Sequence, residues 1–224
     1  SPHDVPGLYE AFGMPEFDEM YQMYERKTSI SKTKIKAQLL FMDLLKERAE
    51  TGRIYIMNID HCNTHSPFKD KVYMSNLCQE ITLPTKPIQH IDDTEGEIAL
   101  CILSAVNLGL IRDKEDLEEL CDLSVRALDE IIDYQEYPIE AARISAESRR
   151  SLGIGYIGLA HFLAKNHVKY DDKDALVLVD EITEAFQYYL LKASNNLAQE
   201  KGKCDYFHMT KYSDGILPID TYKK

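Results

Sequence analysis

One stretch of the chain is apolar almost throughout: Ile98-Ala99-Leu100-Cys101-Ile102-Leu103-Ser104-Ala105-Val106-Asn107-Leu108. Such a run is typical of a strand inside a parallel sheet, where helices cover both faces and leave no solvated side. The run is too short to be a helix that crosses a bilayer. We therefore expect a strand over residues 98–108 that is buried on both faces.

Long amphipathic patterns after this strand predict helices. Asp113 is a typical N-cap residue and precedes apolar residues at helical spacing. A second pattern extends from Asp174 to Gln199, and Gly202 provides its stop signal. The residues expected to face inward are Leu117, Leu120, Cys121, Ser124, Leu128 and Ile131 in the first helix, and Ile182, Phe186, Leu190, Ala193 and Leu197 in the second.

The chain before the strand contains shorter patterns. We expect Ser31 to cap a helix that ends at Gly52, residues 53–58 to form a strand, and residues 75–83 to be extended. Short strands that alternate with long helices indicate the α/β class with parallel pairing. No Pro/Gly-rich linker divides the chain, so we expect residues 1–224 to form one compact unit. The apolar residues at helical spacing in this part are Phe17, Met20, Tyr21 and Tyr24, followed by Ile35, Leu39, Met42, Leu45 and Ala49.

Composition and charge restrict the classes of function. The 224 residues include 26 basic and 38 acidic side chains, which give a formal net charge of −12. A surface of this charge repels polyanions, so we expect neither a nucleic-acid polymer nor an anionic membrane as a partner. The five cysteines are odd in number and include no C-x-x-C pair, which argues against a disulfide framework and a zinc ribbon. Reduced thiols of this kind fit a cytoplasmic protein.

The most informative polar stretch is Ser75-Asn76-Leu77-Cys78-Gln79-Glu80-Ile81. In an extended chain the side chains alternate between faces, so Asn76, Cys78 and Glu80 share one face, and Leu77, Gln79 and Ile81 share the other. A thiol, a proton acceptor and an amide on one surface indicate a pocket for redox or acid–base chemistry. The pattern alone leaves open a half-buried strand with incidental polar residues.

Residues 60–67 contain candidate metal ligands. Cys62 and His65 have C-x2-H spacing, but no second pair with matching spacing follows. The alternative is a turn in which Asp60, Asn63 and Thr64 bond to the local backbone. We favour the turn and expect no metal site.

Residues 153–158 match the pattern G-x-G-x-x-G, which occurs in dinucleotide-binding folds. The pattern requires a buried strand before it, whereas the polar residues 147–151 precede it here. Asp171 and Asp172 stand near the position of a ribose-binding carboxylate, so a nicotinamide-dependent dehydrogenase is an alternative function. We favour a tight turn before a helix over residues 159–164.

The other cysteines give weaker signals. Cys101 lies in the apolar stretch and Cys121 on the inward side of a predicted helix, so on composition both are small core residues. Cys204 lies in a polar loop, and we assign it no role.

The stretch 75–81 resembles the finger-loop motif S-N-L-C-x-E-I of the large, catalytic (alpha) subunit of class I ribonucleotide reductases. The resemblance covers essentially all 224 residues and favours the aerobic bacterial and phage type. The other segments that resemble the family, in the same order, are Ser1–Tyr9, Thr51–Tyr55, Asp60–Pro67, Leu83–Pro87, Arg149–Gly155, Gln187–Ser194 and Gly215–Lys224.

This resemblance implies an α/β fold that is part of a ten-stranded α/β barrel, with a finger loop carrying the active-site cysteine. It also implies reduction of ribonucleoside diphosphates to deoxyribonucleoside diphosphates by thiyl-radical chemistry. Cys78 would become the thiyl radical and take the 3′ hydrogen of the ribose, and Glu80 would accept the proton of the 3′-hydroxyl group. Asn76 would hold the substrate and this carboxylate in register, and the backbone around Leu77 and Gln79 would line the sugar site.

Composition favours a core role for Cys101, but the resemblance implies a different one. In the family, the residue at this position belongs to the pair of cysteines that reduces the 2′ carbon and becomes a disulfide. The second cysteine of the pair lies upstream in the family, as does the effector-binding region. We therefore expect residues 1–224 to be a central fragment, about a third of the subunit, with no turnover alone.

The family also implies what lies outside this chain. The chain itself is expected to hold no cofactor, because a di-metal small subunit supplies the radical and nucleoside triphosphate effectors bind elsewhere. The implied partners are that small subunit, a second large subunit, the ribonucleoside diphosphate substrate, and thioredoxin or glutaredoxin as reductant.

A non-catalytic function is the alternative. The chain would then be an inactive barrel fragment or split-gene piece that acts only by association with the remaining subunit. An incomplete barrel has open sheet edges, which favour association.

Overall fold

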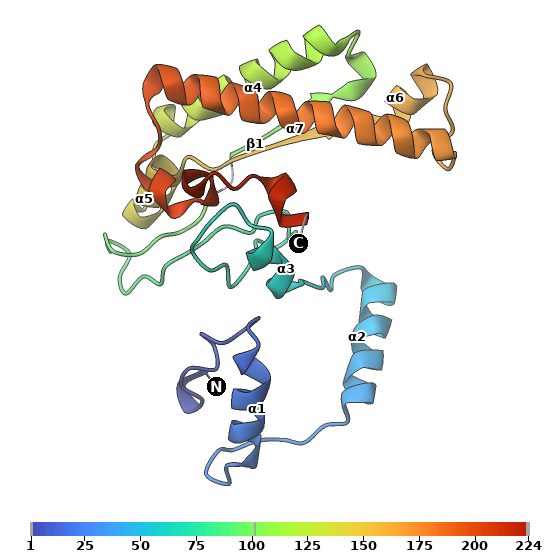
Figure 1. The fold of residues 1–224 in the computed structure, drawn as a ribbon. Coiled ribbons are helices and arrows are strands. Elements are labelled where there is room, and N and C mark those ends of the chain that lie inside the picture. Colours follow the sequence, from blue (N-terminus) through green and yellow to red (C-terminus); the bar gives the residue numbers. More distant parts are fainter. Residues whose placement is uncertain (1, 101, 223–224) are drawn as a thin grey trace. The chain divides into compact units, whose positions relative to one another are not determined.

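A computed structural model describes residues 2–100 and 102–222, and the chain forms two compact units. One unit comprises Ser1–Pro84 and Met209–Lys224, and the other comprises Thr85–His208. That residues 1–224 belong to one incomplete barrel domain stays a prediction. The first unit contains η1 (Pro2–Asp4), α1 (Glu16–Arg26), α2 (Ala37–Thr51), α3 (Ile59–Thr64), η4 (Lys211–Asp214) and η5 (Pro218–Tyr222). The second contains β1 (Ile102–Asn107), η2 (Leu108–Leu110), α4 (Lys114–Tyr134), α5 (Glu140–Arg149), β2 (Leu152–Ile157), α6 (Leu159–Lys165) and α7 (Lys173–Lys201), and η3 (Asp205–Met209) ends at the boundary (Figure 1).

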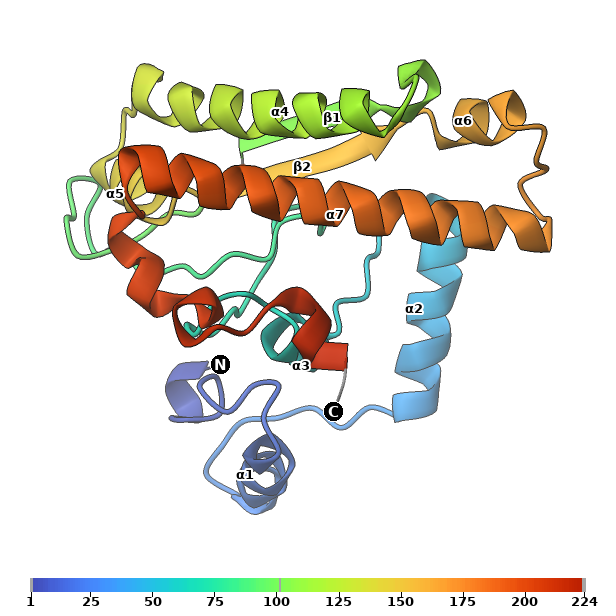
Figure 2. The same cartoon turned by 45° about the horizontal axis from the view of Figure 1, so that its top comes forward.

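The second unit is built on two parallel strands. β1 pairs with β2 in a register that runs from Ile102 opposite Leu152 to Asn107 opposite Ile157. This confirms the predicted α/β character, the parallel pairing and a strand over 102–107, whereas residues 98–100 belong to no strand. Figure 2 shows α4 and α7 side by side along the strands.

Both long helices cover the same face of this sheet. Val106 of β1 is buried in a core with Phe186 of α7, and Tyr156 of β2 packs against it. On the opposite face, Leu103 is 54% exposed and Ile157 is 55% exposed. The predicted burial on both faces is therefore wrong for the described residues, because α4 and α7 lie on one side only.

The two long helices follow the predicted patterns. The Asp113 carboxylate accepts a hydrogen bond from the Asp116 N–H (2.8 Å), as an N-cap does, and α7 ends at Gly202. Leu120 and Ile131, which were expected to face inward, are exposed because they stand at the edge of the apolar stripe. The buried apolar residues of the two helices are Leu117, Cys121, Val125, Leu128 and Ile132 in α4, and Ala175, Phe186, Ala193 and Leu197 in α7.

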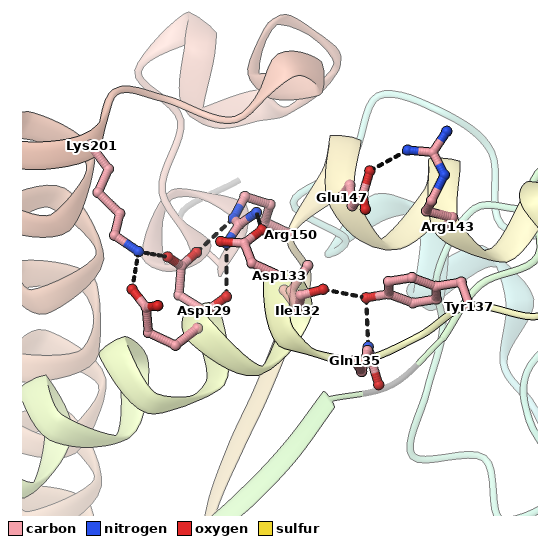
Figure 3. A network of polar contacts seen from close by, with 10 residues as sticks. Asp129, Ile132, Asp133, Gln135, Tyr137, Arg143, Glu147, Arg150 and Lys201 are labelled. Carbon is pink, nitrogen blue, oxygen red and sulfur yellow. Dashed lines mark hydrogen bonds and ion pairs between the residues drawn. The ribbon is translucent and has the colours of Figure 1, made fainter.

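A polar network holds the start of β2 (Figure 3). Arg150 follows α5 with a left-handed backbone (φ +47°), and its guanidinium donates to Asp129 (2.6 Å) and Asp133 (2.7 Å) of α4. Lys201 of α7 donates to the other oxygen of Asp129 (3.0 Å). Burial alone would raise the pKa of Asp129, but Arg150 and Lys201 outweigh it and hold that pKa below its ordinary value. The network therefore ties both long helices to the residue that leads into β2.

A second ionic cluster contains a buried ion pair and an exposed lysine. Glu97 is 2% exposed and Arg149 is 7% exposed. Two guanidinium nitrogens of Arg149 donate to the two carboxylate oxygens of Glu97, at 2.5 and 3.1 Å, and Lys86 lies 2.5 Å from the same carboxylate. The Tyr206 ring lies against both cations, with its centroid 5.2 Å from Arg149 Cζ and 5.6 Å from Lys86 Nζ. Nothing in the sequence pattern predicted this cluster, because its members are far apart in the chain.

The glycine pattern at 153–158 is mostly strand. Gly153 and Gly155 lie within β2, and only Gly158, with φ +75°, makes the turn before α6. The predicted helix is confirmed, but the tight turn is confined to one residue. A dinucleotide-binding pattern places its first glycines in the phosphate loop, so this arrangement argues against that site.

The end of β2 requires a glycine. A Cβ atom on Gly158 would lie 2.4 Å from Asn107 Oδ1 and would sit on a left-handed backbone. We expect Gly158→Ala to lower the free energy of unfolding by roughly 1–3 kcal/mol. Gly155→Ala is the matched control, because nothing lies within 4 Å of a Cβ there. Urea unfolding followed by circular dichroism measures both; equal losses would contradict this explanation.

The first unit follows the sequence pattern less closely. α1 covers the predicted residues, and α2 ends at Gly52 (φ +66°) as predicted, but α2 begins after Lys36 and not after Ser31. No residue of α2 is buried, and Leu39, Leu40, Phe41 and Met42 are each more than half exposed. Residues 53–58 form no strand, because no neighbouring segment pairs with them. No helix within residues 2–100 and 102–222 has the length and apolar character needed to span a membrane.

Candidate active site

Residues 76–81 of the first unit form a tight loop. The Gln79 N–H donates to the Asn76 carbonyl (3.2 Å), and Gln79 has a left-handed backbone (φ +62°). At the base of the loop, the Asn76 N–H donates to the Ile81 carbonyl (3.3 Å), and the Ile81 N–H donates to Asn76 Oδ1 (3.0 Å). The predicted extended conformation is therefore wrong here, because the chain reverses direction and the side chains do not alternate with period 2.

This loop presents its polar side chains to the surface of the chain. Leu77 is 86% exposed, Asn76, Cys78 and Glu80 are also exposed, and Gln79 is half-buried. The structure thus brings all five predicted residues into one turn and leaves the thiol and the carboxylate accessible. A reacting group must be reachable in this way, whereas a core cysteine is not.

The other described cysteines are less accessible than Cys78. Cys121 is fully buried, and burial together with the nearby Glu118 raises the pKa of its thiol to about 11. Cys204 is half-buried, and burial raises its pKa also, while Cys62 is half-buried. The core interpretation of Cys121 is confirmed. Cys101 lies outside the described residues, so its role stays a prediction.

The segment that enters the loop is held by an asparagine. Asn63 Oδ1 accepts the Val72 N–H (2.8 Å), and Asn63 Nδ2 donates to the Val72 carbonyl (2.9 Å) and to the Ile59 carbonyl (2.8 Å). Bonding of Asn63 and of Thr64 to the local backbone is confirmed, although the residues form the helix α3 and not a turn. The pairing with Val72 was not predicted, because it joins two segments that the sequence pattern treats separately.

The neighbours of Val72 are held as well. Lys71 Nζ donates to the Glu10 carbonyl (2.6 Å). The Tyr73 ring stacks on Tyr9, with 4.8 Å between the ring centroids and 16° between the planes. Three consecutive residues before the loop are therefore fixed to other parts of the first unit.

A metal centre is not assembled in the part of the chain that the structure describes. Residues 2–100 and 102–222 contain no group of three or more His, Cys, Asp or Glu side chains that could hold a metal ion. His65 instead stacks on Tyr222, with 4.8 Å between the ring centroids. The C-x2-H spacing of Cys62 and His65 thus has no further ligand among the described residues.

The comparisons with known proteins all indicate the same family. The family model for the ribonucleotide reductase barrel domain matches residues 1–224. The chain is 59% identical to the ribonucleoside-diphosphate reductase subunit alpha of Haemophilus influenzae and 57% identical to ribonucleoside-diphosphate reductase 1 subunit alpha of Escherichia coli. It is 42% identical to the corresponding subunit of Enterobacteria phage T4.

Each of these alignments covers 100% of this chain and 30% of the relative, so the chain spans less than a third of the length of these relatives. Similarity therefore extends across every segment described above, including the loop at residues 76–81. Because the family model matches the chain from end to end, this chain belongs to the ribonucleotide reductase barrel-domain family.

Proposed function

We propose that this chain is the part of a class I ribonucleotide reductase alpha subunit that carries the radical cysteine. The observation that supports the proposal most is the position of Cys78. It is exposed in a tight loop between Asn76 and Glu80, in a chain whose curated relatives are reductase subunits. The whole subunit would reduce ribonucleoside diphosphates to deoxyribonucleoside diphosphates.

The loop geometry suits the proposed division of roles. The Cys78 thiyl radical would take the 3′ hydrogen of the ribose, and Glu80 would accept the proton of the 3′-hydroxyl group. Asn76 Oδ1 is already used by the Ile81 N–H. Asn76 Nδ2 is therefore the atom that would donate to the substrate or to the Glu80 carboxylate, while Leu77 and Gln79 would flank the sugar.

The second half of the reaction needs a reductant. The 2′-hydroxyl group would leave as water, and two thiols would supply two electrons and two protons and become a disulfide. We propose Cys101 as one of these thiols, on the basis of the family resemblance alone. Thioredoxin or glutaredoxin would then reduce the disulfide.

The exposed face of the two-stranded sheet supports the proposal that the chain is part of a barrel. Parallel sheets are normally covered on both faces. The face of β1 and β2 that bears Leu103, Gly155 and Ile157 is exposed, and a Cβ on Gly155 would meet no atom within 4 Å. We propose that this face belongs to the interior of a ten-stranded α/β barrel, and that residues 75–81 are the finger loop of the family.

The remaining assignments follow from the same proposal. The radical would come from a di-metal small subunit, two large subunits would form a dimer, and nucleoside triphosphate effectors would bind segments beyond these 224 residues. The protein would act in the cytoplasm, without a nucleic-acid or membrane partner.

Exchange of segments tests the proposed function. The aligned segment of the Haemophilus influenzae subunit alpha is replaced by these 224 residues, and deoxyribonucleoside diphosphate formation is measured with the small subunit and thioredoxin of that organism. We expect turnover from this chimera and none from the isolated 224-residue chain. A folded chimera that binds the small subunit but has no turnover would favour the non-catalytic alternative.

A further inference from the structure

We infer that Asn63 is a positioning residue for Cys78, because it fixes the buried backbone of the segment that leads into the Cys78 loop. The inference rests on the proposed function of Cys78. Asn63 lies in α3, a helix of six residues, and Val72 lies nine positions further along the chain. The contact therefore joins two separate segments of the first unit.

The hydrogen bonds between the Asn63 side chain and the Val72 backbone resemble those that a neighbouring strand would make with Val72. The side-chain amide accepts from the Val72 N–H and donates to the Val72 carbonyl, at 2.8 and 2.9 Å. Its second N–H donates to the Ile59 carbonyl at 2.8 Å. An asparagine amide has two donors and one acceptor oxygen, so all three polar groups are in use. Asn63 thus has no donor left for a substrate and acts through Val72.

Burial makes this contact difficult to replace. Val72 is 0% exposed, so water cannot readily take over the bonds of its N–H and carbonyl groups. Leaving buried polar groups without partners is unfavourable, and the segment would move to find new ones. Asn76, which closes the loop, stands four positions after Val72, so movement at Val72 reaches the base of the loop directly.

The adjacent contacts are weaker constraints. Lys71 reaches Glu10 through a flexible side chain at the surface, and Tyr73 contacts Tyr9 through rings alone. Neither contact satisfies the backbone groups of Val72. Asn63 is therefore the residue whose loss should disturb the loop most.

The test places a nitroxide spin label on Cys78 in the 224-residue chain, with the other four cysteines replaced by alanine or serine. Asn63→Ala is compared with Asn166→Ala. Asn166 is the matched control because its Nδ2 also donates to a helix carbonyl four residues earlier (2.8 Å) but to no separate segment. We expect Asn63→Ala to increase the mobility of the label in the electron paramagnetic resonance spectrum, and Asn166→Ala to leave it unchanged.

Asn63→Asp is the second variant, in case Asn63→Ala does not fold. Its carboxylate still accepts from Val72 but faces the Val72 and Ile59 carbonyls without a proton to donate, so we expect the same increase in mobility. Unchanged mobility in a folded Asn63 variant would overturn the inference.

Turnover of the chimera separates positioning from a general loss of structure. Small displacements of reacting groups reduce rates strongly, so we expect kcat to fall between about 10- and 100-fold in both Asn63 variants with KM unchanged. A purely structural role would lower the folded fraction and leave kcat per folded molecule unchanged, and this result would also overturn the inference. If the unmodified chimera has no turnover while the label responds as expected, the proposed function fails and the effect of Asn63 on the loop stands.

Discussion

Replacing Cys78 with serine in the chimera is expected to abolish deoxyribonucleoside diphosphate formation, with turnover reduced on the order of 10³-fold or more. The proposed reaction needs a side chain that gains and loses a hydrogen atom, and the O–H bond of serine is too strong for that exchange. The thiol is exposed in a tight loop whose hydrogen bonds are made by Asn76, Gln79 and Ile81. Serine should therefore fit the loop and leave the fold intact.

The control for this substitution is Cys62→Ser in the same unit. Cys62 is half-buried in α3 and has no place in the proposed reaction. We expect Cys62→Ser to keep most of the turnover and Cys78→Ser to keep the binding of nucleotide while losing product. Turnover by the Cys78 variant would remove this residue from its proposed role. Equal loss in both variants would indicate a general sensitivity to serine.

The long helices were predictable because their signals are local and repeated. α4 has an N-cap aspartate and an apolar stripe along its length, and α7 has an apolar stripe of its own and a terminal glycine. The parallel pairing of β1 and β2 follows from a helical crossover of this length. Burial on one face only could not be predicted, since composition does not show on which side of the strands the two helices pack.

The loop at residues 76–81 shows where pattern reasoning fails. Alternating polar and apolar residues indicate a strand, but the conformation depends on the side-chain oxygen of Asn76 and the left-handed backbone of Gln79. Each of these two features depends on a single residue, and neither changes the alternation of polar and apolar residues along the stretch. The family resemblance predicts which residues carry the chemistry. Only the structure shows that Asn63 holds the segment before the loop and that Asn76 closes the loop.

Glu97→Ala is expected to have the largest effect on stability. Removing one partner of a buried ion pair leaves the charge of the other buried without that partner, which lowers the free energy of unfolding by about 3–5 kcal/mol. Arg149 would remain buried beside the Tyr206 ring without its carboxylate. The chain has no tryptophan, so urea unfolding is followed by circular dichroism. Glu140→Ala removes a half-buried carboxylate from Arg143, which keeps Glu147 as a partner, and should change the unfolding midpoint much less.

The effect of Glu97 should also depend on pH. Burial alone would raise its pKa, but Arg149 and Lys86 outweigh burial and hold the pKa below its ordinary value of about 4.3. A carboxylate with a lowered pKa in the folded state stabilises the protein above the pKa of the unfolded state, and this contribution is lost as the pH falls through the folded-state value. The difference in stability between the wild-type chain and Glu97→Ala should therefore be constant above about pH 5 and shrink below it. A difference that stays constant into acid would mean that the loss comes from packing and not from the charge.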